Sequence, residues 1–71
     1  MEIEFGAKVT DQKGKVVGTV DHIVRDSWSG EIKKFMVRRE DQDLFLSTDD
    51  VAEATKSQVK LKISLEELNE R

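Results

Sequence analysis

The side chains of this 71-residue chain that could do acid–base chemistry are one histidine, His22, and several carboxylates. A histidine acts as a general base only when the substrate proton and an orienting partner lie within hydrogen-bond reach. Asp21 and Asp26 are near His22 in sequence only. Catalytic carboxyl pairs need one member in an apolar pocket, whereas the others here lie in polar, turn-like segments: Glu40, Asp41, Asp43, Asp49 and Asp50. The sequence therefore predicts a protein that is not an enzyme and has no catalytic residues.

The residue types also argue against metal and covalent chemistry. The chain has no cysteine, which excludes thiol mechanisms, and with a single histidine it also excludes zinc sites of the usual cysteine and histidine type. The segment "EDQD" (residues 40–43) lacks the glycine and the final glutamate of a calcium-binding loop. No serine lies in a Gly-x-Ser-x-Gly motif. We therefore expect no bound metal ion and no cofactor.

A basic cluster is the best candidate for nucleic-acid binding, and Trp28 and Phe35 could in principle stack on bases beside it. Its members are Lys33, Lys34, Arg38 and Arg39. Alternation along a strand sends Lys33 and Arg39 to one face and the other two to the opposite face. The net charge of −3 also disfavours general binding to nucleic acid. A solvated strand that resists aggregation explains the cluster better, and an RNA- or ribosome-associated role through this strand is the alternative function.

Short alternating segments predict that these side chains are carried by β-strands. The first strand is expected at residues 3–10, with one buried apolar face made by Ile3, Phe5, Ala7 and Val9. Further strands are predicted at residues 15–25, 31–39, 44–47 and 58–63, separated by turns in which Gly14 and Gly30 are structural. Gly6, inside the first of these segments, is also expected to be structural.

The second strand contains the clearest indication of a closed sheet. Val17 and Val20 cannot share a face in an unbroken strand, and Gly18 lies between them. A glycine inside a strand pattern predicts a β-bulge, which bends the strand. Ser64 and Glu67 have the spacing of a capping box and predict a short helix after the last strand. Together these features predict an all-β fold, a small β-barrel of five to six strands with a short C-terminal helix, as a single domain over residues 1–71.

Apolar residues out of phase with the core give the main functional hypothesis. A third strand with Phe35 and Val37 inside leaves Met36, and also Ile32, off that face. Ile23 beside Val24 raises the same conflict in the second strand.

The only tryptophan, Trp28, lies between two serines and just before a glycine, which is typical of a turn. With Ile23 and Met36 it would form one exposed apolar patch of the kind that marks contact surfaces. Charged residues beside the patch would set the register of binding: Asp21, Arg25, Lys34 and Arg38. The alternative is that the terminal helix covers the patch.

The order of these residues resembles the PRC-barrel domain family over about residues 5–65. The matching features are Gly6 to Val9, Asp11 with Gly14, Gly18 with Val20, Asp26 with Gly30, and "DDV" at residues 49–51. The resemblance implies a six-stranded barrel that docks proteins without catalytic residues, in a family that includes dimers and a domain of a ribosome maturation factor. The sixth strand would come from residues 51–55 or from a split at Gly18.

Size and composition complete the prediction. A core of this size rarely contributes more than ~3–5 kcal/mol, so a homodimer is expected. No apolar run could span a bilayer and the N-terminus lacks the pattern of a signal peptide. We therefore expect a cytoplasmic adaptor whose partners are a second copy of itself and another, unidentified protein.

Overall fold

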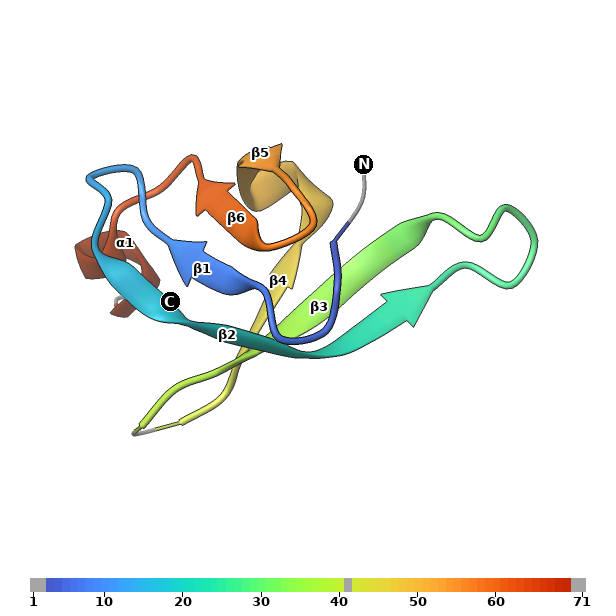
Figure 1. Ribbon diagram of the computed structural model, residues 1–71, viewed down its shortest axis with the longest axis horizontal. Coiled ribbons are helices and arrows are strands. Elements are labelled where there is room, and N and C mark those ends of the chain that lie inside the picture. Colours follow the sequence, from blue (N-terminus) through green and yellow to red (C-terminus); the bar gives the residue numbers. More distant parts are fainter. Residues whose placement is uncertain (1–2, 41, 70–71) are drawn as a thin grey trace.

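Six β-strands form one sheet, in the order β4-β3-β2-β1-β6-β5, in the computed structural model (Figure 1). The structure describes residues 3–40 and 42–69. The elements are β1 Lys8–Thr10, β2 Val16–Arg25, β3 Ile32–Arg38, β4 Leu44–Ser47, the 3-10 helix η1 Thr48–Asp50, β5 Val51–Ala54, β6 Gln58–Leu61 and α1 Leu65–Asn69. The sixth strand is β5, from the predicted segment 51–55, and β2 runs unbroken through Gly18.

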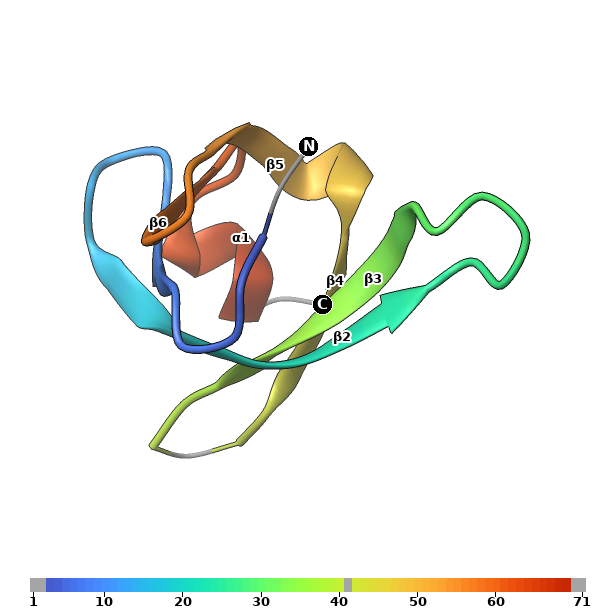
Figure 2. The same cartoon turned by 45° about the vertical axis from the view of Figure 1, so that its right-hand side comes forward.

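Strand β1 joins the two halves of the curled sheet, because it pairs with the next strand, β2, and with β6, which is distant in sequence. Val9 lies opposite Gly18 of antiparallel β2 and opposite Val59 of parallel β6. The six strands therefore wrap around a shared interior as a half-barrel (Figure 2). Figure 1 places α1 at the end opposite the long β2–β3 hairpin. The predicted all-β, barrel-like fold with a short C-terminal helix is confirmed.

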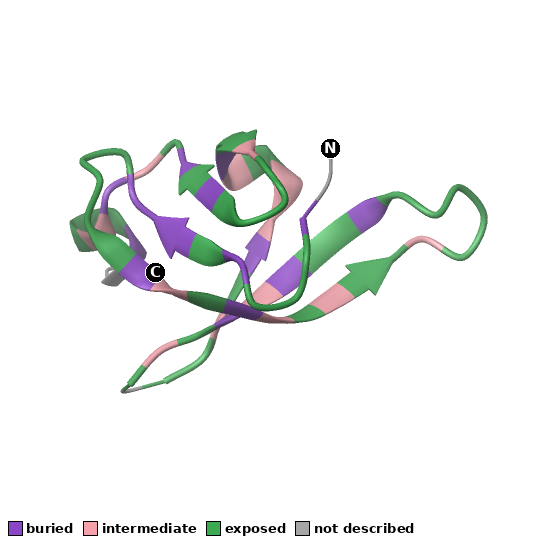
Figure 3. Ribbon diagram, in the orientation of Figure 1, coloured by how far each residue is buried: buried purple, intermediate pink, exposed green. Residues whose placement is uncertain are grey.

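One hydrophobic cluster fills the concave side of this sheet. Figure 3 shows the alternation of buried and exposed positions along the strands. Phe35 and Val37 are fully buried, as their alternation predicted, and Leu68 of α1 is buried with them. The cluster comprises Ile3, Ala7, Val9, Val17, Val20, Ile32, Phe35, Val37, Leu46, Val51, Val59, Leu61 and Leu68. The predicted domain limits, residues 1–71, include residues 1–2, 41 and 70–71, which lie outside the described part of the chain.

The first predicted strand is wrong over its first half. Only Lys8–Thr10 is a strand, and Phe5 is 73% exposed rather than buried. A turn interrupts the alternation: the N–H of Ala7 donates to the carbonyl of Glu4 at 3.1 Å, and Gly6 has a φ of +86°. A positive φ is readily adopted by glycine. This turn therefore breaks the alternation, and the Phe5 side chain points into solvent instead of into the core.

Bulges explain why both Val17 and Val20 are buried. Val9 faces Gly18 while Thr10 faces Val16, so Val17 is an extra residue in β2. The bulge predicted at Gly18 is therefore present, directly beside it. Gly18 also has a second role. A Cβ at this position would overlap the carbonyl oxygen of Arg38 and lie 2.9 Å from Cγ1 of Val37. Gly18 therefore permits the close approach of β3.

A bulge in β3 overturns the placement of Ile32. Val24 pairs with Lys34 but Arg25 pairs with Ile32, so Lys33 is the extra residue. The phase of β3 changes there, and Ile32 joins Phe35 in the core at 8% exposure. Ile32 was expected on the face of Met36, and that expectation is wrong.

The N-cap of the C-terminal helix is the residue that the sequence predicted, Ser64. The N–H of Glu67 donates to Oγ of Ser64 at 3.3 Å, and α1 begins at the next residue after Ser64. Ser64 is buried. This cap satisfies one of the N–H groups that a helix start leaves without a partner.

Candidate functional site

The β2–β3 hairpin extends beyond the core, and its outer part, residues 25–31, is here called the hairpin arm (Figure 1). Trp28 lies at its tip and is 97% exposed. Figure 3 shows that the connecting loop is almost wholly exposed. The alternative in which the terminal helix covers Trp28 is therefore wrong for this residue. A large apolar side chain is held in solvent at the end of a projecting arm.

Asp26 fixes the backbone that carries Trp28. Its Oδ1 accepts hydrogen bonds from the N–H of Trp28 at 2.8 Å and from that of Ser29 at 3.1 Å. Its carbonyl accepts from the N–H of Gly30 at 2.9 Å, where a φ of +75° turns the chain back. The Arg25 guanidinium donates to the Gly30 carbonyl at 2.9 Å. The loop therefore presents Trp28 from a tied, hydrogen-bonded turn.

The electrostatics of the tip keep Asp26 charged. Backbone hydrogen bonds from Ser29 and Trp28, together with the Lys33 ammonium 3.6 Å away, hold the pKa of Asp26 below its usual range. A charged carboxylate is the stronger acceptor. The loop geometry is thus supported throughout the neutral pH range.

A second exposed apolar surface covers the convex side of β2, β3 and β4, and we call it the outer face. Met36 pairs with His22 on one side and with Phe45 on the other, and residues directly opposite in a ladder share a face. Phe45 is 63% exposed and Val24, in the next row beside Lys34, is 38% exposed. Met36 is half-buried between them. The outer face is therefore an apolar band that solvent reaches.

The structure separates the residues that were expected to form one patch. Ile23 pairs with Phe35 and packs against the core, so it points to the side of the sheet opposite to Met36. Trp28 lies beyond both at the arm tip. Three of the predicted interface residues, Lys34, Met36 and Arg38, do share the outer face, because they are alternate residues of β3.

On the outer face, Phe45 and Val24 are the exposed apolar residues that sequence reasoning missed. The signal for Phe45 was present in "LFLS", where alternation with Leu44 and Leu46 points it away from the core. Val24 was noted only as a neighbour of Ile23. Its outward direction depends on the register with Lys34, which the sequence alone does not reveal.

Ion pairs neutralise much of the basic cluster. The Arg38 guanidinium lies 3.5 Å from Oδ2 of Asp21, and Lys33 pairs with Asp26. The Lys34 ammonium lies 5.6 Å from the centre of the Phe45 ring, within the range of a cation–π contact. At least two of the four cations thus face a carboxylate, and the cluster is not an open positive surface.

His22 is exposed, and its Nδ1 lies 3.0 Å from Oδ2 of Asp21. The expectation that Asp21 is near His22 in sequence only is therefore wrong. Glu40, Asp43 and Asp49 do not gather around it. Asp43 is exposed just before β4, Asp49 is exposed in η1 after β4, and Glu40 follows the end of β3. Asp41 lies outside the described residues. Within residues 3–40 and 42–69, no group of three or more histidine or acidic side chains is placed to hold a metal ion.

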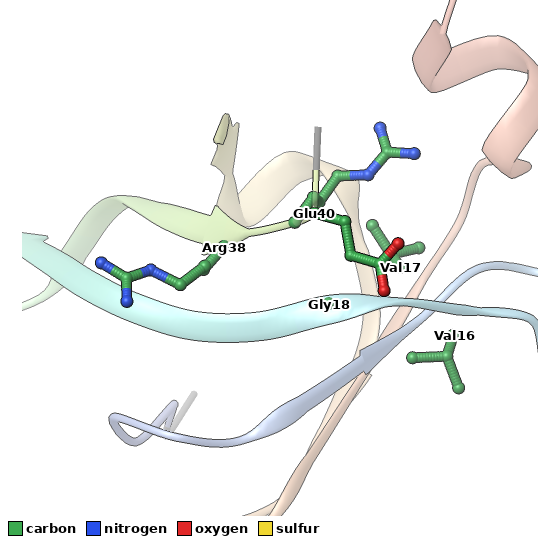
Figure 4. A pocket seen from close by; sticks show the side chains of 6 residues that line it. Val16, Val17, Gly18, Arg38 and Glu40 are labelled. Carbon is green, nitrogen blue, oxygen red and sulfur yellow. The ribbon is translucent and has the colours of Figure 1, made fainter. Parts of the chain in front are cut away.

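A hollow of about 320 Å³ lies where β2 begins and β3 ends, lined by Val16, Val17, Gly18, Arg38, Arg39 and Glu40. Figure 4 shows the Arg38 side chain directed away along β2 and the Glu40 carboxylate above Gly18 and Val17. These lining residues include neither a histidine nor a nucleophile. The arrangement suits packing of two strand ends more than catalysis.

Fold and surface together define a small β half-barrel with a projecting aromatic arm. No family model matches the chain, and no curated protein matches it. Among the described residues the only α-helix, α1, is far too short to cross a membrane.

Proposed function

We propose that this chain is a non-enzymatic protein-docking module that also self-associates, and that Trp28 is its main anchor. The observation that carries the proposal is the 97% exposure of an indole on a loop held by Asp26. Tryptophan is enriched among the residues that contribute most to binding. Because the loop is tied before binding, little backbone entropy is lost when a partner encloses the indole.

The resemblance to the PRC-barrel family supports the same function. That resemblance implies a docking barrel of six strands, and six strands are present. The family assignment remains part of the proposal, as does a cytoplasmic location, with which the absence of cysteine agrees. Arg25 has a supporting part, since it braces the arm through the Gly30 carbonyl.

The test compares capture of partner proteins by three forms of the chain. Immobilised wild type, Trp28→Ala and Phe5→Ala would be exposed to lysate of the source organism, and bound proteins quantified by mass spectrometry. Phe5 is the matched control because it is an aromatic residue, 73% exposed, outside the arm. We expect a specific set of proteins to be lost with Trp28→Ala and kept with Phe5→Ala, with thermal unfolding unchanged for Trp28→Ala.

Equal capture by all three forms would refute a docking role for Trp28. Salt-dependent RNA binding that disappears when Lys33, Lys34, Arg38 and Arg39 are replaced by alanine would favour the RNA-associated alternative. The ion pairs of Arg38 and Lys33 give that alternative less support.

A further inference from the structure

Strand β4 leaves one edge of the sheet open. It is the terminal strand of the six and, within the described chain, pairs only with β3. The N–H of Ser47 donates to Oδ2 of Asp50 at 3.3 Å, so it points away from β3. Backbone groups of alternate residues point the same way, so the N–H and C=O of Phe45 also face the open edge.

Strand β4 is short, with four residues, but its edge lacks the other features by which proteins usually prevent strand pairing. Proline, a lysine on the edge, a bulge or an inward charge would discourage addition of another strand. Strand β4 reads LFLS and its ladder with β3 runs without a register shift. The edge is therefore competent to accept a strand.

We propose that a second copy of the chain pairs antiparallel with this edge, about a two-fold axis at Phe45. This inference rests on the self-association in the proposed function and assigns the surface that performs it. Antiparallel pairing about that axis puts Phe45 opposite its own symmetry mate and Leu44 opposite Leu46 of the second copy. The facing pair of Phe45 residues would exchange both of their backbone hydrogen bonds.

Side chains on both sides of the sheet agree with this register. On the inner side Leu44, half-buried, would meet the buried Leu46 of the second copy. On the outer face the two Phe45 rings, each 63% exposed, would lie side by side next to the Met36 residues. Aromatic cross-strand pairs of this kind stabilise sheets.

Charge complementarity favours a second copy over another occupant. Asp43 lies directly before β4 and two residues from Phe45, so continued alternation would put it on the same face. It forms no ion pair with any described residue. In the proposed register Asp43 lies opposite Ser47 of the second copy, whose neighbour in β3 is Lys34. Each copy thus offers an acid at one end of the edge and a base at the other, as a two-fold interface requires.

The first experiment uses the absence of cysteine from the chain. In a hydrogen-bonded pair the Cα atoms are about 5.5 Å apart, within the range of about 4.4–6.8 Å that a disulfide spans. We expect Phe45→Cys to form a disulfide-linked dimer under mild oxidation at least about tenfold faster than Phe5→Cys, if the Phe45 symmetry mates meet. Trp28→Cys, on the arm, is expected to behave like Phe5→Cys.

A charge exchange tests the register without altering Phe45. Asp43→Lys would place two cations together across the interface, and Lys34→Asp would place two acids together. Sedimentation over a concentration series should show the dimer association constant of each single variant reduced by about threefold to tenfold. The double variant should recover most of the wild-type value, because the opposite charges face each other again.

Three outcomes would overturn the inference: a wild type that stays monomeric at all concentrations, equal crosslinking of Phe45→Cys and Phe5→Cys, or no recovery in the double variant. A monomer that still captures partners through Trp28 would leave the docking role standing and remove only the β4 edge. A dimer that crosslinks at Phe45 while Trp28→Ala captures partners normally would support the edge and refute the docking role of Trp28.

Discussion

Oδ2 of Asp11 accepts a hydrogen bond from the backbone N–H of Leu65 at 2.9 Å, across 54 positions of sequence. Oδ1 of the same carboxylate accepts from the N–H groups of Lys13 and Lys15 at 2.9 and 2.8 Å. Asp11 is fully buried. One side chain therefore closes the first turn and ties it to the first residue of α1. The bond holds the helix against the end of the half-barrel.

The stability of the protein should fall in acid because of Asp11. Burial alone would raise its pKa, but hydrogen bonds from Leu65, Lys15 and Lys13 outweigh it and hold the pKa of Asp11 below the usual 3.8. The folded-state pKa lies below that of the unfolded chain, so the contribution to stability is complete above the unfolded pKa. It is lost as the pH falls through the folded pKa. Urea titrations between pH 7 and pH 2 would measure the decline.

Asp11→Asn is the informative variant for that titration. We expect it to be less stable than wild type at pH 7 and to lose less stability below pH 4, because the amide does not titrate. Asp49→Asn is the control, since Asp49 is exposed. If the two variants gave the same stability and the same acid slope, Asp11 would not be the group responsible.

Gly18→Ala should destabilise the sheet more than Gly30→Ala. An added Cβ at Gly18 would meet backbone of Arg38 and the Val37 side chain, whereas at Gly30 nothing lies within 4 Å. We expect a loss of about 1–3 kcal/mol or more for Gly18→Ala from overpacking, and about 1–2 kcal/mol for Gly30→Ala from its positive φ. Thermal and urea unfolding of both variants would give the order. The reverse order would show that β3 can move away from β2 at little cost.

Trp28 should report binding directly, since it is the only tryptophan in the chain. Its 97% exposure predicts emission typical of indole in water and quenching by iodide close to that of free tryptophan. A bound partner should shift the emission to the blue and reduce quenching. Strong protection of the free protein at low concentration would contradict the exposed position of the indole.

Removing the cap of α1 should loosen the C-terminal helix. Ser64→Ala deletes the oxygen that accepts from the N–H of Glu67, and loss of such a cap costs about 1 kcal/mol. Because α1 buries Leu68 in the core, the lost stability should appear in global unfolding. Ser27→Ala, at an exposed position in the arm, is the control and should unfold as wild type does.

Regular alternation carried most of the fold prediction, and local interruptions limited it. Phe35 with Val37, and Val59 with Leu61, alternate cleanly and are buried as expected. Ile32 was misplaced because the extra residue at Lys33 is visible only in the pairing with β2. A bulge depends on the partner strand, so one strand's sequence does not reveal it.

The candidate site was also predictable only where local sequence determines the structure, and not where it depends on pairing between strands. The Ser and Gly neighbours of Trp28 predicted an exposed turn, and the indole is exposed. The direction of Ile23 depended on its pairing with Phe35, which placed it on the core side. Asp11 reads in sequence as an ordinary turn residue, because its partner Leu65 is brought to it only by the folded sheet.

The parallel pairing of β1 with β6 has a consequence for synthesis on the ribosome. Strands β2, β3 and β4 pair with their neighbours in sequence, so they can form a meander as the nascent chain emerges. Val9 of β1 can pair with Val59 only after β6 has emerged. Contacts this distant in sequence form late and slowly. Until residue 61 has left the exit tunnel, the emerging polypeptide therefore exposes apolar side chains that the folded protein buries, so chaperone capture should persist until β6 has emerged.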